Sequence, residues 1–355
     1  MTDKHSLVFL GYNNMFTHKR GVENVIHFQS QVSPFAVNYY LHWDSATHVY
    51  RFENLICIGV KKNLLWFISL NVLLFKIKKK KKLFIHSHNP LMSIMSMYNS
   101  NLFTVHDALY YLTGGTKHRL NKVFWLLEKI LYLRTDFVHF ISNYAKKMSL
   151  FSGNKNFIII PNTSHLENYK MNNKMSQSIE NKKFKIAATK VFIVRSIEER
   201  ARIDLIIKVA VFLKEENYEF IVAGKGPLLI FYREEIKKLN LKNITLLGYV
   251  HDDELVNYYN ECDIVLVPAE YGEGFGLPII EGYLFNKPVI ASNRCAIPEV
   301  IYSKDFIFEN KVESIIEKLE FTKKYLKPSF KDYYDEKFSN AIVFKSMNQL
   351  YNKLS

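Results

Sequence analysis

A glycine-rich segment between residues 269 and 282 constrains the fold of this chain more than any other feature of the sequence. The apolar run 264–267 is typical of a buried strand, and residues 277–285 have apolar side chains at helical spacing, so the glycines fall at a strand-to-helix junction. Such a junction offers an anion backbone N–H groups that lack intrahelical partners. Glu273 precedes the predicted helix and Glu281 lies within it. The two carboxylates would contact different parts of one elongated ligand, and a pyrophosphate that bridges two sugars fits.

The spacing of Glu273 and Glu281 resembles the donor-site signature of the retaining glycosyltransferases of family 4, found in bacterial surface polysaccharide (O-antigen or capsule) biosynthesis. Residues 263–268, 287–292 and 298–300 look like the strand, next strand and following loop that surround that signature. The resemblance implies an α/β protein of the GT-B fold, with two facing Rossmann-like domains, parallel sheets and a C-terminal helix that crosses back to the first domain. The alternative is a structural loop with two solvated glutamates.

Length and composition agree with two globular domains. The chain has 355 residues, which is more than one hydrophobic core usually organises. A content of 48% hydrophobic and 23% charged residues is typical of a globular protein. Cys57, Cys262 and Cys295 are too few and too scattered for a disulfide framework or a cysteine metal cluster. The first residues show no signal-peptide pattern. We therefore expect a cytoplasmic protein.

Short apolar runs that alternate with helical or irregular stretches predict the domain organisation. We expect an acceptor-binding domain at 1–165, a polar linker at 166–183, a nucleotide-sugar-binding domain at 184–330 and a returning C-terminal helix at 331–355. The strands expected in the two domains span residues 7–10, 52–58, 83–86, 102–105, 137–141, 157–160, 185–189, 220–223, 244–247 and 264–267.

The resemblance implies that two cations neutralise the leaving diphosphate. Arg195 matches the family's arginine, whereas the expected lysine is missing. Arg200 or Arg202 would replace it, and Lys190 is a more distant candidate. Arginine suits this task because its planar fork makes bidentate phosphate contacts. The other interpretation of each arginine is a solvated charge on a helix.

Further donor contacts follow from the resemblance. Glu281 would hold the ribose hydroxyls, and Glu273 would bind or position the sugar. The main chain of residues 247–250 would read the nucleobase, with Val250 or Tyr249 at the base face. The turn at 223–227 would have a structural role, and the acidic run 251–254 is interpreted as a helix cap and not a metal site. We expect no metal and no cofactor. The backbone of the glutamate loop would bind the donor at Gly274, Phe275, Gly276 and Leu277.

The first domain is expected to complete the catalytic site. Gly21 resembles the glycine of a loop that approaches the donor phosphate, and His106 matches a family histidine near the transferred sugar. A lone histidine is more often structural, but His106 ends a predicted strand. His86 and His88 end the preceding predicted strand and are expected to border the same cleft.

The net charge of +14 indicates an acidic partner. Residues 76–82 are nearly all lysine, and residues 117–134 combine basic and apolar side chains as an interfacial helix would. The apolar segment 64–75 is better interpreted as a domain helix than as a membrane contact. We expect an anionic membrane surface as the partner, and no recognised motif supports nucleic acid.

The predicted reaction moves a hexosyl unit from a nucleoside diphosphate sugar to a hydroxyl of a polyprenyl-diphosphate-linked glycan, with retention at the anomeric carbon. The helix-start amides and Arg195 would stabilise the charge that develops on the leaving diphosphate. Two alternatives stay open: a nucleotide-sugar epimerase or hydrolase on the same fold, and a non-enzymatic basic scaffold that binds lipid or nucleic acid.

Overall fold

The chain forms two compact α/β units. Unit 1 comprises Met1–Asn162 and Ala341–Ser355, and unit 2 comprises Thr163–Asn340. The computed structural model describes residues 5–17, 21–80, 82–106, 121–151, 153, 156–172, 188–325 and 329–355.

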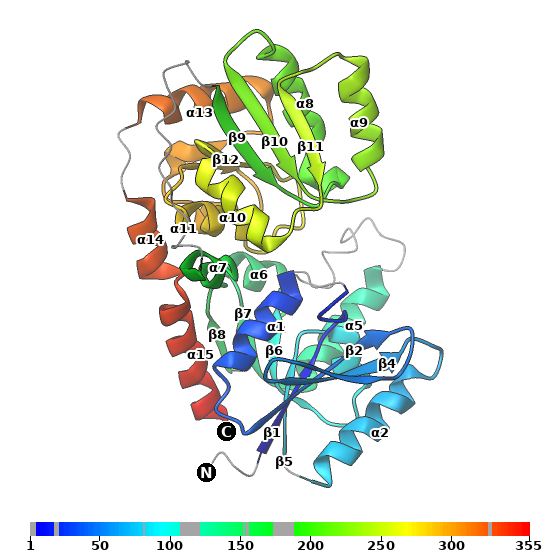
Figure 1. Ribbon diagram of the computed structural model, residues 1–355. Helices are drawn as coiled ribbons and strands as arrows, with labels where there is room; N and C mark the ends of the chain where they lie inside the picture. Colours follow the sequence, from blue (N-terminus) through cyan, green and yellow to red (C-terminus); the bar gives the residue numbers. More distant parts are fainter. Residues whose placement is uncertain are drawn as a thin grey trace. The chain divides into compact units, whose positions relative to one another are not determined.

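Unit 1 is built on an eight-stranded sheet (Figure 1). The edge strand β3 runs antiparallel to β4, and the other neighbouring strands are parallel. The carboxyl ends of the parallel strands therefore share one edge of the sheet, where α/β domains bind ligands. The order across the sheet is β3 (Val49–Phe52), β4 (Leu55–Lys61), β2 (Val37–Asp44), β1 (His5–Leu10), β5 (Lys82–Ser87), β6 (Ser100–Val105), β7 (Thr135–Phe140) and β8 (Asn156–Ile159).

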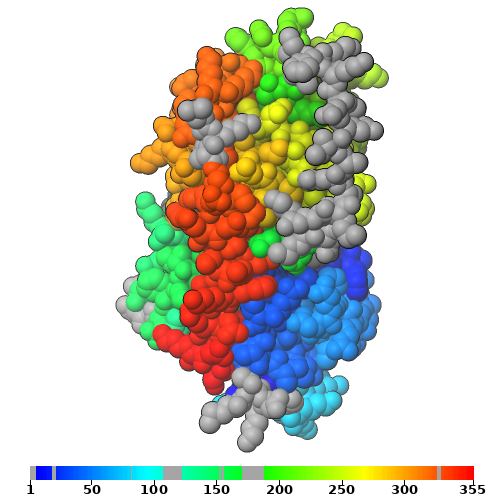
Figure 2. Space-filling view, turned by 60° about the vertical axis from the view of Figure 1, so that its left-hand side comes forward, coloured from blue at the N-terminus to red at the C-terminus, as the bar shows by residue number. Residues whose placement is uncertain are grey.

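Helices cover both faces of this sheet. The helices α1 (Gly21–Gln31) and α15 (Asn340–Leu354) share one apolar cluster, and α2 (Trp66–Lys78) and α3 (Pro90–Met95) share another. Although α15 comes last in the sequence, Figure 2 shows it in red against blue N-terminal residues. The rings of Phe28 and Phe344 stack with centroids 4.1 Å apart, so α15 packs on α1 as part of unit 1. Two further helices of this unit are α5 (Asn121–Leu133) and α6 (Asn143–Met148).

Unit 2 has a six-stranded sheet in which every neighbouring pair is parallel. The order is β11 (Ile244–Gly248), β10 (Tyr218–Ala223), β9 (Thr189–Val194), β12 (Ile264–Val267), β13 (Val289–Ser292) and β14 (Ile307–Phe308). Its α-helices are α7 (Leu166–Asn172), α8 (Ile203–Phe212), α9 (Leu229–Lys238), α10 (Asp252–Glu261), α11 (Leu277–Leu284), α12 (Ile297–Val300), α13 (Val312–Lys324) and α14 (Phe330–Lys337).

Two parallel-sheet Rossmann-like domains were predicted, and the structure confirms them, with the antiparallel β3 as an unpredicted addition. The strand predicted at 185–189 is wrong in position: β9 starts at Thr189, and residues 185–187 lie outside the described residues. The sequence reasoning also missed β2, β3 and β14. Within the predicted linker, residues 166–172 form α7, and residues 173–183 lie outside the described residues.

Candidate active site

The carboxyl ends of the strands of unit 2 bring Arg195 and Glu273 into direct contact. Arg195 follows β9, and Glu273 lies in the loop between β12 and α11. Nη1 of Arg195 forms an ion pair with Oε2 of Glu273, and only 7% and 14% of the two side chains are exposed. Nε of Arg195 is also buried, and it has no hydrogen-bond partner among the described residues. A buried N–H group without a partner is costly, so this one is available to an incoming anion.

Two glycines allow the loop that carries Arg195 to pack closely. A Cβ atom at Gly224, where φ is +148°, would lie 1.7 Å from the carbonyl oxygen of Arg195. A Cβ atom at Gly226 would lie 2.2 Å from the carbonyl oxygen of Ile197. The Gly-x-Gly-Pro turn after β10 therefore packs directly against the backbone of the Arg195 loop, which agrees with the structural role predicted for it.

The glutamate loop leads into α11 through two left-handed glycines. Gly272 has φ +67° and Gly276 has φ +96°, conformations that a residue with a side chain rarely adopts. Gly276 is the N-cap of α11, and the helix begins at Leu277 with a proline in its first turn. The Phe275 side chain is buried against Phe338, so any donor contact at this residue would come from its backbone. Donor binding by the backbone of residues 274–277 at the start of this helix stays a prediction.

Arg200 and Arg202 have different surroundings. Arg200 donates from Nη1 to the carbonyl oxygen of Gly272 at 2.8 Å and pairs with Glu198, and about a third of its side chain is exposed. Arg202 adopts the left-handed conformation before α8 and is bound by two carboxylates, Asp204 and Glu270.

These contacts shift the pKa values of Arg202 and Glu270. The hydrogen bond that Arg202 donates to Asp204 is the main cause of a raised pKa at Arg202. Burial would raise the pKa of Glu270, but hydrogen bonds from Arg202 and Asn310 outweigh it and lower this pKa. Because Arg202 already serves a local network, Arg200 is the better candidate for the missing lysine.

Glu281 lies on α11 and is held by a residue that the sequence reasoning missed. Its side chain is buried, and its Oε2 accepts a hydrogen bond of 2.7 Å from the hydroxyl of Tyr259, a fully buried residue of α10. Burial raises the pKa of Glu281, while His165 and the Tyr259 hydroxyl oppose the shift. Tyr259 thereby orients the carboxylate. No sequence motif marks Tyr259, because an aromatic residue at helical spacing is indistinguishable from an ordinary core residue.

The predicted nucleobase segment follows β11. Gly248 has φ +85° and is followed by the exposed Tyr249 and the half-buried Val250. The ammonium of Lys225 lies 4.2 Å from the ring centroid of Tyr249. An exposed aromatic face with an adjacent cation can stack on a base, so Tyr249 and Val250 both stay candidates for the base contact.

The acidic run after Val250 was interpreted as a helix cap, and the structure corrects the details. The N-cap of α10 is His251, with no side-chain capping bond. Asp252 instead lies in the first turn of α10, where an acidic side chain is favourable, and pairs with His165 at 3.2 Å.

In unit 1 the predicted residues lie at two strand ends. Gly21 is exposed and begins α1, while residues 18–20 of its loop lie outside the described residues. His106 directly follows β6, and its Nε2 lies 2.8 Å from Nδ1 of the buried His88, which follows β5. Asp107 lies outside the described residues.

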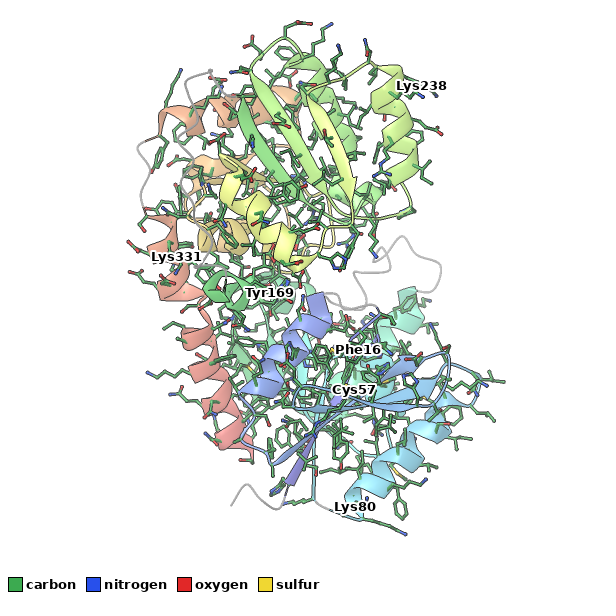
Figure 3. The ribbon with its side chains drawn as sticks, in the orientation of Figure 1. Phe16, Cys57, Lys80, Tyr169, Lys238 and Lys331 are labelled. Carbon is green, nitrogen blue, oxygen red and sulfur yellow. The ribbon has the colours of Figure 1, made fainter. Side chains whose placement is uncertain are left out.

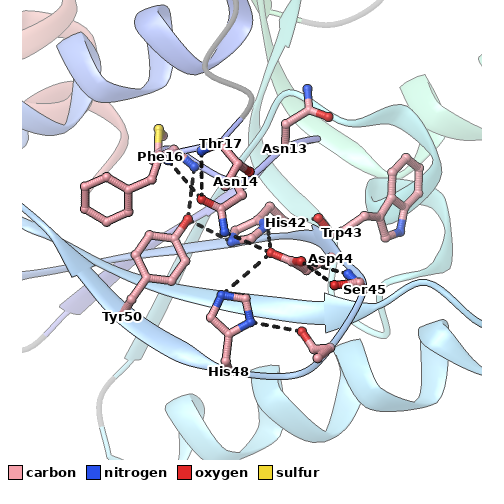
Figure 4. Close-up of polar contacts among 12 residues, drawn as sticks. Asn13, Asn14, Phe16, Thr17, His42, Trp43, Asp44, Ser45, His48 and Tyr50 are labelled. Carbon is pink, nitrogen blue, oxygen red and sulfur yellow. Dashed lines mark hydrogen bonds and ion pairs between the residues drawn. The ribbon is translucent and has the colours of Figure 1, made fainter.

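A polar cluster that the sequence reasoning missed also lies at this edge of unit 1 (Figure 4). Asp44, at the end of β2, accepts a hydrogen bond of 3.0 Å from Asn14 of the loop after β1. Tyr50 of β3 donates toward His42 at 3.0 Å and accepts from the backbone N–H of Met15. The cluster braces the loops after β1 and β2 against each other.

The described residues can be compared with the requirements of a metal site and of a membrane-spanning helix. Among them, no three His, Cys, Asp or Glu side chains gather as metal ligands would. Metal independence stays a prediction. No described helix has both the length and the apolar character needed to cross a bilayer.

Comparison with known proteins agrees with this geometry. Residues 175–325 match the family model described as Glycosyl transferases group 1. An uncharacterised 41.2 kDa protein from the cps region of Klebsiella pneumoniae is 29% identical over 188 residues, which span 52% of this chain and 51% of that protein. The O-antigen biosynthesis glycosyltransferase WclY of Escherichia coli is 24% identical over 330 residues, 88% of this chain and 82% of WclY.

Solved structures show the fold across almost the whole length. HepE of Anabaena, determined with UDP and glucose, has a TM-score of 0.74 at 11% identity and covers 98% of this chain and 99% of its own. Taken with the sheet topology, these similarities show that the chain has the GT-B fold and that residues 175–325 are similar to the glycosyl transferases group 1 domain.

Proposed function

We propose that this glycosyltransferase moves a hexosyl unit, with retention, from a nucleoside diphosphate sugar to a lipid-linked glycan of surface polysaccharide biosynthesis. The observation that carries the proposal is the buried contact between Arg195 and Glu273, with Nε of Arg195 left without a described partner. A buried cation with unused donor capacity suits a diphosphate. The role of WclY in O-antigen biosynthesis and the UDP and glucose bound to HepE support the pathway and the donor class.

In this mechanism the bond between the anomeric carbon and the diphosphate oxygen breaks while the acceptor oxygen bonds to the same carbon. Arg195, with Arg200 or Arg202, stabilises the charge left on the diphosphate, and the backbone of residues 274–277 adds N–H donors. The leaving phosphate takes the acceptor proton. Glu281 holds the ribose, and Glu273 moves from Arg195 toward the sugar when the diphosphate arrives. Gly21 lies in the loop that approaches the donor phosphate, His106 lies near the transferred sugar, and the main chain near Val250 reads the nucleobase. The cations make a metal ion unnecessary for this charge.

Saturation-transfer NMR with a panel of nucleoside diphosphate sugars, without added metal, tests the donor site. We expect one donor to bind the wild type and to be lost in Glu281→Ala. Glu261→Ala is the matched control, because Glu261 is an exposed glutamate of α10 with 66% of its side chain exposed. Absence of binding by every donor, with the protein folded, contradicts the transferase proposal and favours the scaffold. Donor turnover without any acceptor favours the epimerase or hydrolase.

The proposed place of action is the inner face of the cytoplasmic membrane, and the surface of α2 supports it. This helix has apolar side chains on two opposite sides, but only one of them packs on the sheet, through Leu70, Leu74 and Ile77. On the other side Ile68, Val72 and Phe75 are 45% to 49% exposed. An exposed apolar side of a helix with basic residues beside it suits contact with a membrane surface.

The apolar surface continues across α3 and α5. Asn71 of α2 donates to the carbonyl oxygen of Met95 at 3.0 Å, and Arg134, after α5, donates to the carbonyl oxygen of Ser96. Twelve of the 24 large apolar side chains that are exposed among the described residues lie on these three helices or directly beside them. They are Leu64, Leu65, Ile68, Val72, Phe75, Leu91, Met95, Met97, Val123, Trp125, Leu126 and Leu133.

The charge around this surface fits anionic lipid. Between residues 54 and 106 the sequence has eight lysines and no Asp or Glu. Lys80, labelled in Figure 3, lies at the carboxyl end of α2. The one carboxylate of α5, Glu128, is buried and accepts from the backbone of Leu150 at 2.8 Å. Exposed apolar residues with basic neighbours are typical of interfacial binding.

Vesicle sedimentation tests the membrane part separately from catalysis. We expect the wild type to bind phosphatidylglycerol vesicles at low salt, and the triple variant Ile68→Ser, Val72→Ser, Phe75→Ser to lose at least tenfold in affinity. The control variant Ile230→Ser, Phe231→Ser changes two even more exposed apolar residues of α9 in unit 2 and should bind as the wild type does. Equal binding by all three proteins, or none by the wild type, contradicts this surface.

A further inference from the structure

Four histidines lie at the carboxyl ends of neighbouring strands in unit 1. His86 lies at the end of β5, His88 and His106 directly follow β5 and β6, and His139 lies in β7. Burial lowers the pKa of all four, to about 3 for His106 and about 4 for His139. At neutral pH each ring is therefore uncharged and carries one N–H group.

The hydrogen bonds of His139 and His86 determine which ring nitrogen carries the proton in each of these two histidines. Nε2 of His139 lies 2.9 Å from the carbonyl oxygen of Ile160, an acceptor, so this nitrogen donates. Nδ1 of His139 must then accept from the hydroxyl of Thr104 at 2.9 Å. The Thr104 oxygen accepts from Nε2 of His86 at 2.7 Å, and Nδ1 of His86 accepts from the hydroxyl of Tyr351 at 2.8 Å. His86 and His139 are thus both protonated on Nε2.

The other two histidines, His88 and His106, are joined to each other by a hydrogen bond between their rings. Nδ1 of His88 lies 2.8 Å from Nε2 of His106, so one of these two nitrogens donates to the other. The His88 ring is 1% exposed, and its Nε2 is buried without a partner among the described residues. If His106 donated, His88 would need its proton on Nε2, as a buried N–H without an acceptor. Such groups are rarer than buried acceptors without a donor.

We propose that His88 is a positioning residue that donates from Nδ1 to Nε2 of His106 and so fixes His106 as the Nδ1–H tautomer. His106 then offers the transferred sugar a hydrogen-bond donor and takes no part as acid or base. This role rests on the proposed function, in which His106 lies beside the sugar. The tautomer itself does not depend on that function. The titratable neighbours of the pair are His86 and His139, and both are neutral by the same burial.

Long-range ¹H–¹⁵N correlation spectra of the full chain with labelled histidine measure the tautomers directly. Single histidine variants assign the signals. We expect Nδ1 to be protonated in His88 and His106, and Nε2 in His86 and His139. A His106 ring protonated on Nε2 overturns the proposal, whether or not the protein is an active transferase.

Two variants of His88 test the positioning role. Asparagine carries its amide nitrogen where Nδ1 lies, and glutamine carries it where Nε2 lies. We expect His88→Asn to keep most of kcat and the Nδ1–H tautomer of His106, and His88→Gln to lose kcat about tenfold or more with little change in the KM for the donor. The exposed His48→Gln, with 42% of its side chain exposed, is the control.

The outcomes separate the inference from the function on which it rests. Loss of activity in both variants to the same degree, with both folded by circular dichroism, would mean a merely structural His88. A kcat of the wild type that rises or falls as one group titrates between pH 5 and 8, together with loss of that transition in His106→Asn, would show that His106 acts as acid or base. If no transferase activity exists, the spectra still decide the tautomer.

Discussion

The titratable side chains at the strand ends are charged and paired in unit 2 but neutral in unit 1. In unit 2, Arg195, Arg200 and Arg202 each pair with a carboxylate, and burial is tolerated because opposite charges meet. In unit 1, the histidines at the strand ends are kept neutral by burial and form hydrogen bonds with neutral partners. One Rossmann-like edge is thus prepared for an anionic ligand and the other for neutral hydroxyl groups. The shared fold sets the position of the site, and the side chains set its chemistry.

The largest expected effect breaks the charged side of this comparison. Arg195→Ala should lower donor turnover about 1000-fold, because it removes a preorganised cation and leaves Glu273 buried without its partner. Single-turnover kinetics with a lipid-linked acceptor measures it. Arg202→Ala should cost less activity than Arg200→Ala, since Arg202 already serves Asp204 and Glu270. The reverse order would assign the second cation to Arg202.

The next effect concerns the support of that cation. Gly224→Ala should destabilise the protein by about 3 kcal/mol, because its Cβ would overlap the carbonyl oxygen of Arg195 at an unfavourable φ. Urea unfolding measures the loss. Gly153→Ala is the control: this glycine also has a positive φ, but no atom lies within 4 Å of the added Cβ. Equal losses in both variants would mean that backbone strain alone matters.

Acid sharpens the comparison between the units. His106 and His139 have folded-state pKa values below the ordinary 6.5, so the unfolded chain binds more protons between these values. Stability is complete above about pH 6.5 and falls as pH drops toward 4, by about 1.4 kcal/mol per pH unit for each histidine.

Hydrogen exchange read separately for the two units measures this effect. We expect unit 1 to lose about 2 kcal/mol or more between pH 7 and pH 5. In unit 2 the raised pKa of Glu281 acts the other way, since its protonation favours the folded state. Equal losses in both units would contradict the buried neutral histidines.

The smallest effect tests the residue that orients Glu281. Tyr259→Phe removes one hydroxyl that donates to Oε2 and should weaken donor binding about tenfold, the value of one hydrogen bond to a charged group. Calorimetry measures the affinity. Tyr258→Phe, at the neighbouring position of α10, should bind as the wild type does.

Much of the donor side could be predicted from the sequence, because its residues occupy a local pattern. Glu273 and Glu281 are separated by the end of one loop and the first turn of α11, and Arg195 follows a strand. The contact between Arg195 and Glu273 could not, since it joins residues 78 positions apart. The identity of the second cation depends on the carboxylates that the fold places beside Arg200 and Arg202. Neither is visible in a local pattern.

Unit 1 shows where a single sequence is weaker. The strand β2 (Val37–Asp44) was missed, although it is rich in aromatic residues, because its buried and half-buried positions do not alternate regularly. The bond between Tyr351 and His86 joins residues 265 positions apart and depends on where α15 packs. The uncovered side of α2 was interpreted as core, since an apolar helix on its own does not show which of its sides a neighbour covers.

The most direct test of the central claim is calorimetric titration of a nucleoside diphosphate into Glu273→Gln and Arg195→Ala. If the paired charges form the diphosphate site, Glu273→Gln should bind the diphosphate more tightly than the wild type, since it frees Arg195 and removes a repelling carboxylate. Arg195→Ala should lose binding. Weaker binding in both variants, or unchanged binding in both, would contradict the exchange of Glu273 for diphosphate at Arg195.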